Sequence, residues 1–233
     1  MAEKIEREAD RYVRDKWYQH IWYHYKWVII GVLAVVVLLS IVIADTVRKD
    51  PVDMYIIYVT EDPAVYREKT EALKKTIAPY VPDLNGDGKI VLQIKNFYIG
   101  QNYSATAVEN NKNELRTIMW SGTCMFFVAD RVGSEFLLAE NSGAGVLESL
   151  TDIAEESSLD SDGRLWLANG TEFFKNELFE DWDSELYFGL RLYNGTVSSI
   201  QKSSVKHFNQ AHQTLSNIIN GKKLYPGETD SAD

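Results

Sequence analysis

The sequence MYIIYV at residues 54–59 is the stretch that decides the fold. It is an unbroken apolar run rich in β-branched and aromatic residues, a pattern typical of a strand that is buried on both faces. Asp62 and Pro63 follow it closely and predict the start of a helix, with Asp62 as the N-cap. We expect this helix to end near Ala78, because Pro79 cannot continue it.

The same alternation of strand and helix continues downstream. Residues 89–99 have a pattern that predicts a second strand, residues 104–120 predict a second helix, and residues 124–128 predict a third buried strand. The order β-α-β-α-β is typical of a mostly parallel sheet with right-handed crossovers. The sequence therefore predicts an α/β fold.

The second half of the chain has a less regular pattern. Residues 134–141 predict a short helix, residues 186–193 a strand, and residues 203–220 a helix with one apolar face. We expect a single mostly parallel, three-layer α/β domain over residues 50–224. A polar and disordered tail is expected at residues 225–233.

Upstream of this domain, the run WVIIGVLAVVVLLSIVIA at residues 27–44 contains 18 residues without a charge. At 1.5 Å per residue it would form about 27 Å of helix, close to the thickness of the hydrocarbon core of a bilayer. The sequence predicts a transmembrane helix at residues 27–45, preceded by a cytoplasmic juxtamembrane helix at residues 1–26. The alternative is a cleaved signal peptide, in which Val42 and Ala44 would occupy the small-residue positions before the cleavage site. The long segment before the apolar run favours an uncleaved anchor.

The charges beside the apolar run predict its orientation in the bilayer. Arg48 and Lys49 follow the run, whereas five basic residues lie within about 20 residues before it: Arg7, Arg11, Arg14, Lys16 and Lys26. Because basic residues gather on the cytoplasmic side of a span, we expect a single-pass protein of the cell membrane. Its N-terminus would be cytoplasmic and its C-terminal domain extracellular.

The charge of the chain excludes one class of partner. The chain carries 34 acidic and 24 basic residues, and the part beyond Lys49 carries 28 and 16, which is a net charge of −12. An acidic domain of this kind does not displace counterions from phosphate, so we expect no binding to nucleic acid. The single cysteine, Cys124, lies in an apolar run and is expected to be a buried, inert thiol.

Several phrases carry a resemblance to known families. Residues 125–152 contain an apolar strand that ends at Asp130, a short helix with Phe136 and Leu137, and a loop that leads to a short apolar and acidic segment. This order, with the closing strand and helix at residues 186–220, resembles one lobe of extracellular solute-binding proteins. Those proteins close two lobes on a ligand, whereas this chain has material for one. The resemblance carries over no binding residue.

The chain as a whole, from about residue 17 to 221, is similar to uncharacterised single-pass membrane proteins of clostridial Firmicutes. The phrases that carry this similarity are Tyr25-Lys26-Trp27 before the membrane helix and the acidic turn at residues 83–89. The resemblance implies an extracytoplasmic domain on a membrane anchor.

The acidic turn is the one local motif with recognisable chemistry. Its sequence DLNGDGK places oxygen-bearing residues at positions 1, 3 and 5 of a calcium loop, a glycine at position 6, and a backbone carbonyl at position 7. The candidate calcium ligands are Asp83, Asn85, Asp87 and, by its backbone, Lys89. Position 12 is Ile94, so the usual bidentate acid is missing. The alternative is a plain Asn-Gly and Asp-Gly turn. The acidic turn at residues 160–163 carries less signal for metal.

Motifs for catalysis are absent from the sequence, including the nucleophile elbow, the phosphate-binding loop and HExxH. We therefore expect a non-enzymatic, membrane-anchored domain that acts through contacts with another membrane or envelope protein. The alternative is a receptor or sensor for a small molecule, such as a sugar or peptide. Such a receptor would have a pocket at the carboxyl ends of the strands, near Thr60, Tyr98 and Asp130. A hydrolase that uses two of the many carboxylates is the third choice.

Overall fold

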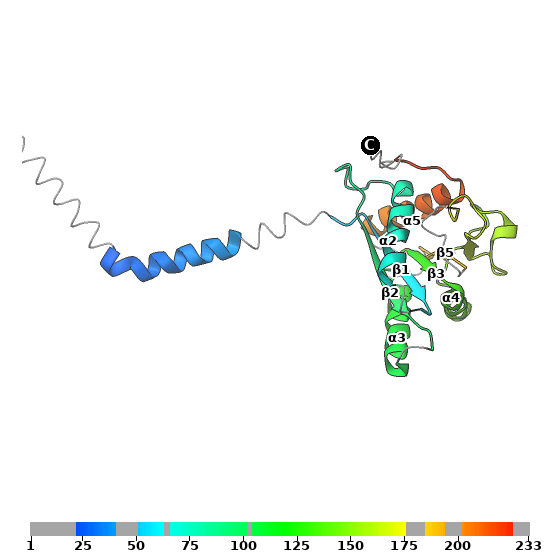
Figure 1. The fold of residues 1–233 in the computed structure, drawn as a ribbon, viewed down its shortest axis with the longest axis horizontal. Coiled ribbons are helices and arrows are strands. Elements are labelled where there is room, and N and C mark those ends of the chain that lie inside the picture. The colour runs from blue at the N-terminus through cyan, green and yellow to red at the C-terminus, as the bar shows by residue number, and fades with distance from the viewer. Residues whose placement is uncertain are drawn as a thin grey trace, which may run out of the picture. The chain divides into compact units, whose positions relative to one another are not determined.

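The computed structural model describes residues 22–40, 51–62, 66–101, 104–175, 185–193 and 202–225 (Figure 1). The chain divides into two compact units, residues 1–50 and residues 51–233, and each is described by itself. The predicted juxtamembrane helix before residue 22, the end of the predicted span at residues 41–45 and the predicted tail after residue 225 lie outside the described residues.

The described part of the first unit is an apolar helix, Trp22–Ser40, of 19 residues. It is long and apolar enough to cross a membrane, with a mean hydropathy of 1.7. Large apolar side chains are exposed along its length, among them Trp27 and Leu38. The helix begins before Trp27, where the uncharged run starts, because Lys26 and the aromatic residues preceding it continue the helical backbone.

The second unit is an α/β domain built on a five-stranded sheet with the strand order β2-β1-β3-β5-β4. Its elements are β1 (Met54–Thr60), α2 (Tyr66–Ile77), the 3-10 helix η1 (Ala78–Tyr80), β2 (Leu92–Tyr98), α3 (Ala105–Ser121), β3 (Phe126–Ala129), α4 (Arg131–Ala144), the 3-10 helix η2 (Glu156–Ser158), β4 (Leu165–Leu167), β5 (Tyr187–Leu190) and α5 (Lys202–Ile219). The α/β class and the predicted strands and helices are therefore confirmed, with ends that shift by a few residues. The predicted start of the first helix at Asp62 and Pro63 stays a prediction, because residues 63–65 lie outside the described residues.

The sheet is mixed, and the predicted mostly parallel sheet is corrected in this respect. Strand β1 pairs in parallel with β2 and β3, whereas β5 pairs antiparallel with both β3 and β4. Helix α4 connects β3 to β4, which runs in the same direction as β3. Strand β5 then returns between them in the opposite direction. A β-carbon at Gly189 of β5 would lie 2.6 Å from Cδ2 of Leu165, so the glycine permits the close approach of β4.

Helices cover both faces of the sheet, which makes a three-layer domain (Figure 1). Consecutive residues of a strand point to opposite faces. On one face, Ile56 and Tyr58 of β1 share a buried core with Leu73 of α2 and Leu215 of α5.

On the other face, Ile57 of β1 shares a second core with Leu115 of α3 and Leu137 of α4. Strand β1 lies between the two cores, and Tyr55 is its one exposed residue. The unbroken apolar pattern of residues 54–59 is explained by this central position.

The helices end where local chemistry requires it. The α-helical part of α2 ends at Ile77, before the 3-10 turn that contains Pro79. Helix α4 is longer than the predicted 134–141, because Asp130 accepts a hydrogen bond from the backbone N–H of Gly133 and so caps a helix that begins at Arg131. Asn217 and Ile218 of α5 accept hydrogen bonds from Lys222 N–H (2.8 Å) and Gly221 N–H (3.2 Å). With Gly221 at φ +64°, these bonds form a Schellman motif.

Candidate functional site

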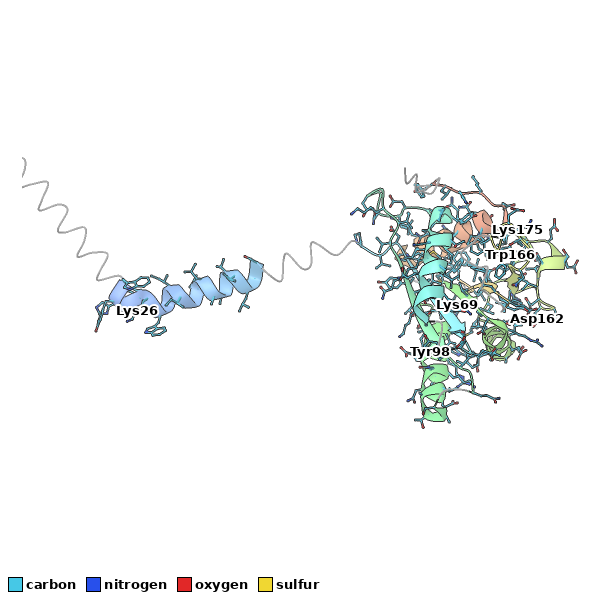
Figure 2. All side chains as sticks on the ribbon, in the orientation of Figure 1. Lys26, Lys69, Tyr98, Asp162, Trp166 and Lys175 are labelled. Atoms are coloured by element: carbon cyan, nitrogen blue, oxygen red, sulfur yellow. The ribbon has the colours of Figure 1, made fainter. Side chains whose placement is uncertain are left out.

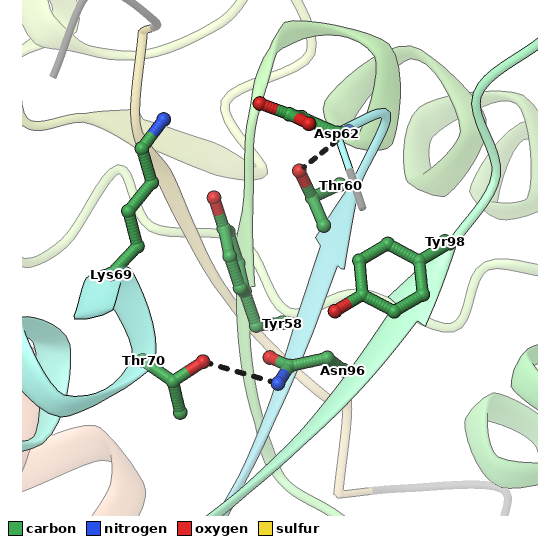
Figure 3. A pocket seen from close by; sticks show the side chains of 7 residues that line it. All are labelled: Tyr58, Thr60, Asp62, Lys69, Thr70, Asn96 and Tyr98. Carbon is green, nitrogen blue, oxygen red and sulfur yellow. Dashed lines mark hydrogen bonds between the residues drawn. The ribbon is translucent and has the colours of Figure 1, made fainter. Parts of the chain in front are cut away.

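The carboxyl ends of β1 and β2 form a small polar pocket, where the sequence predicted a binding site near Thr60 and Tyr98 (Figure 3). The parallel register pairs these two residues directly. The pocket is lined by Tyr58, Thr60, Asp62, Lys69, Thr70, Asn96 and Tyr98. Its volume is about 10 Å³, which is room for about one water molecule and not for a solute.

Polar side chains that line this pocket form hydrogen bonds with one another. Asn96 Nδ2 donates to Thr70 Oγ1 over 3.1 Å, while the buried Asn96 Oδ1 has no hydrogen-bond partner among the described residues (Figure 3). Burial raises the pKa of Tyr58 above its usual range, so this hydroxyl stays protonated. The pocket is a small polar, hydrogen-bonding site that suits a bound water.

Asp130 does not line this pocket. Its carboxylate is buried, with 3% exposure, and its two oxygens accept hydrogen bonds from the backbone N–H groups of Gly133 (2.8 Å) and Glu61 (2.7 Å). A β-carbon at Gly133 would lie 2.4 Å from the carbonyl oxygen of Val59, so α4 packs directly on the end of β1. In open α/β sheets ligands bind at the point where the strand order reverses, here between β1 and β3. In this domain the carboxylate of Asp130 lies at that point and is hydrogen-bonded to the end of β1 and to α4.

The candidate calcium ligands lie together in an exposed turn. Asp83 accepts hydrogen bonds from the backbone N–H groups of Asn85 (3.1 Å) and Gly86 (2.7 Å) at one oxygen and of Gly88 (2.8 Å) at the other. These N–H groups, that of Gly88 foremost, lower the pKa of Asp83. Within the turn, Asn85 and Asp87 accept hydrogen bonds from N–H groups two residues ahead.

This pattern is that of a turn stabilised by its own side chains, and it uses the oxygens that a cation would also need. Gly86 and Gly88 have positive φ values of 75° and 79°, as such a turn requires. Across the described residues, no group of three or more His, Cys, Asp or Glu side chains is placed to hold a metal ion. Calcium binding by Asp83, Asn85, Asp87 and the Lys89 carbonyl stays a prediction.

The second acidic turn is built in the same way. Asp160 accepts hydrogen bonds from the backbone N–H groups of Asp162 (2.9 Å) and Arg164 (2.7 Å). Its carboxylate orders the loop that leads into β4.

Cys124 is buried, as predicted. Its thiol donates to the carbonyl oxygen of Tyr55 over 3.3 Å, and burial raises its pKa to about 12. A thiol with this pKa is protonated at neutral pH and is a poor nucleophile.

No family model, curated protein or solved structure matches this chain.

A groove that the sequence analysis missed lies at the amino ends of β1 and β2. Its volume is about 280 Å³, and it is lined by Tyr55, Ile56, Ile57, Gln93, Lys95, Ile118, Thr123 and Cys124. Tyr55, which lines this groove, has 52% exposure. We call this surface the edge groove. Tyr55, an aromatic residue within the apolar run at residues 54–59, was the one available signal for this groove in the sequence.

Proposed function

We propose that this chain is a membrane-anchored, non-enzymatic domain that acts through contact with another membrane or envelope protein. The apolar helix Trp22–Ser40 would be the anchor, since it has the length and composition of a membrane span. The basic residues that precede this helix in the sequence support a cytoplasmic N-terminus and an extracellular α/β domain. The bilayer and one protein are then its partners.

The arrangement of side chains at the carboxyl ends of the strands supports the non-enzymatic part of the proposal. An enzyme of this fold class would have its reacting groups there. Instead, Asp130 is engaged by two backbone N–H groups, and the neighbouring pocket has room for about one water. The relation to one lobe of solute-binding proteins is part of the same proposal and is supported by the phrases at residues 125–152 and 186–220.

The edge groove is the main observation that supports the proposed contact with another protein. Within the described residues, β2 pairs with β1 alone and forms one edge of the sheet. A free edge strand beside an apolar groove suits the addition of an extended segment, in which backbone hydrogen bonds give affinity and a side-chain pocket gives specificity. The ion pair between Lys95 and Glu114 (2.5 Å) lies at the surface, with both side chains about half exposed, and would be displaced at little cost.

Site-specific crosslinking in native membranes tests this proposal. A photo-reactive amino acid in place of Gln93, which lines the edge groove, should capture one dominant protein. The matched control is the same amino acid in place of Asn209, an exposed residue of α5. We expect Tyr55→Ser to reduce capture at position 93, because Tyr55 lines the same groove. Capture of no protein, or of the same proteins from both positions, would contradict the proposal.

A further inference from the structure

A basic pocket lies on this acidic domain, where the C-terminal ends of α2 and α5 meet the loop after β4. Its volume is about 460 Å³, within the range of pockets that hold small molecules. It is lined by Lys75, Thr76, Pro79, Tyr80, Glu172, Phe173, Lys175, Gly221 and Lys223. Figure 2 shows Lys175 close to α5. We propose that this three-lysine pocket binds a phosphate-bearing ligand.

The walls of the pocket are fixed by hydrogen bonds between segments far apart in the sequence. The Schellman motif that ends α5 turns the chain toward η1, where Leu224 N–H donates to the carbonyl oxygen of Pro79 over 2.8 Å. Asn217 Nδ2 donates to the carbonyl oxygen of Tyr80 over 3.0 Å. These bonds hold the backbone beside Lys223 against the segment that follows Lys75.

The charge of the pocket is opposite to that of the domain. Three lysines face one acid, Glu172, whose carboxylate pairs with Lys175 over 2.6 Å. Lys75 and Lys223 have no ion pair within the described part of the chain. The C-terminal ends of α2 and α5 favour cations nearby, which helps to hold the ammonium groups together. In a domain with a net charge of −12, this surface is suited to attract an anion.

Thr76 supplies a second, independent observation. It lines the same pocket, it has 5% exposure, and its buried hydroxyl Oγ1 has no hydrogen-bond partner among the described residues. A buried hydroxyl without a partner costs stability, so such groups in native proteins usually have a functional or solvent partner. A change of the Thr76 rotamer toward the pocket would let a ligand oxygen provide that partner.

The donor set favours phosphate over a simple carboxylate. Three ammonium groups and one hydroxyl provide donors for more oxygens than the two of a carboxylate, and lysine binds phosphate as a point charge. Tyr80 and Phe173 also line the pocket, and their ring centroids are 5.9 Å apart. This apolar surface suits the organic part of a phosphate ester.

Calorimetry of the full chain in detergent micelles, with inorganic pyrophosphate as the probe, tests the proposal. We expect measurable binding that weakens as NaCl rises, because exposed charges are screened by salt. The triple variant Lys75→Gln, Lys175→Gln, Lys223→Gln should raise the Kd about tenfold or more. Thr76→Val should raise the Kd about threefold or more without lowering the Tm, since the hydroxyl has no partner to lose within the described protein.

The matched control is the triple variant Lys112→Gln, Arg131→Gln, Lys206→Gln. It changes the net charge equally, and none of its three residues lines the pocket. We expect its Kd to stay within about twofold of the original, as for exposed charges far from a site. Absence of pyrophosphate binding, an equal loss in the two triple variants, or equal affinity for citrate and pyrophosphate would overturn the proposal.

A final comparison distinguishes a free phosphate ester from a lipid headgroup. Glycerol phosphate in solution is compared with phosphatidylglycerol vesicles, and phosphatidylcholine vesicles serve as the neutral control. Pocket-dependent binding of the soluble ester identifies a free ligand, whereas pocket-dependent retention on phosphatidylglycerol vesicles alone identifies a lipid headgroup. If the triple variant Lys75→Gln, Lys175→Gln, Lys223→Gln bound both glycerol phosphate and phosphatidylglycerol vesicles as the original chain does, the phosphate site would be refuted.

Discussion

Replacement of Asp130 by alanine should destabilise the α/β domain by about 3 kcal/mol. The carboxylate caps α4 through Gly133 N–H and also holds Glu61 N–H at the end of β1. Loss of an N-cap costs about 1 kcal/mol, and loss of a hydrogen bond to a charged group costs about 1.5–3 kcal/mol. For a domain of this size, 1 kcal/mol lowers the Tm by about 2–4 °C, so we expect a decrease of about 10 °C.

Urea titration of the full chain in micelles, followed by tryptophan fluorescence, measures this loss. Asp130→Ser should restore about half of it, because serine can cap α4 but is too short to reach Glu61 as well. Asp152→Ala removes an exposed carboxylate and should stay within about 0.5 kcal/mol of the original chain. A loss below about 1 kcal/mol for Asp130→Ala, or no recovery with serine, would refute the argument that this carboxylate joins β1 to α4.

Four further predictions concern topology, metal, acid and thiol. Protease added to intact cells should degrade residues 51–233 and spare residues 2–26; the reverse pattern would invert the topology. Millimolar calcium should raise the Tm slightly relative to EDTA, and Asp87→Ala should abolish this rise, whereas identical melting in both solutions would favour the plain turn. Because backbone N–H groups lower the pKa of Asp83, its stabilising contribution is present above the unfolded pKa of about 3.9 and is lost as pH falls through the lower folded value. Asp83→Asn should therefore reduce the acid dependence of stability between these pKa values, and an unchanged profile would count against the hydrogen bonds at this turn. The buried thiol of Cys124 should resist iodoacetamide at pH 8 and react fully in guanidinium chloride, while rapid labelling of the folded chain would place it at the surface.

Local patterns in the sequence predicted the elements of the domain well. Residues 54–59 predicted a doubly buried strand because both neighbouring faces of β1 are covered, and Pro79 marked the end of α2 because proline lacks the N–H that a helix needs. The start of α4 was placed too late, since capping by Asp130 extends a helix whose first turn has little apolar pattern.

Strand direction and the candidate sites depended on contacts between distant residues. The periodicity of residues 186–193 predicts a strand but does not indicate whether it runs parallel to β3. The acidic turn at Asp83 could be recognised because its hydrogen bonds stay within six residues. The three-lysine pocket could not, because Lys75, Lys175 and Lys223 meet only after the domain has folded.

The position of α5 sets a limit on when the domain can fold during synthesis. This helix covers one face of the sheet, and its Thr214 and Gln210 reach back to Met54 and Pro82, 160 and 128 residues earlier. Until α5 has emerged, the apolar face formed by β1 and α2 has no cover from that helix. Nearly the whole domain must therefore leave the ribosome before that face is protected, so the domain completes its folding only after α5 has been synthesised. During that interval the nascent chain is open to chaperones, and also to aggregation.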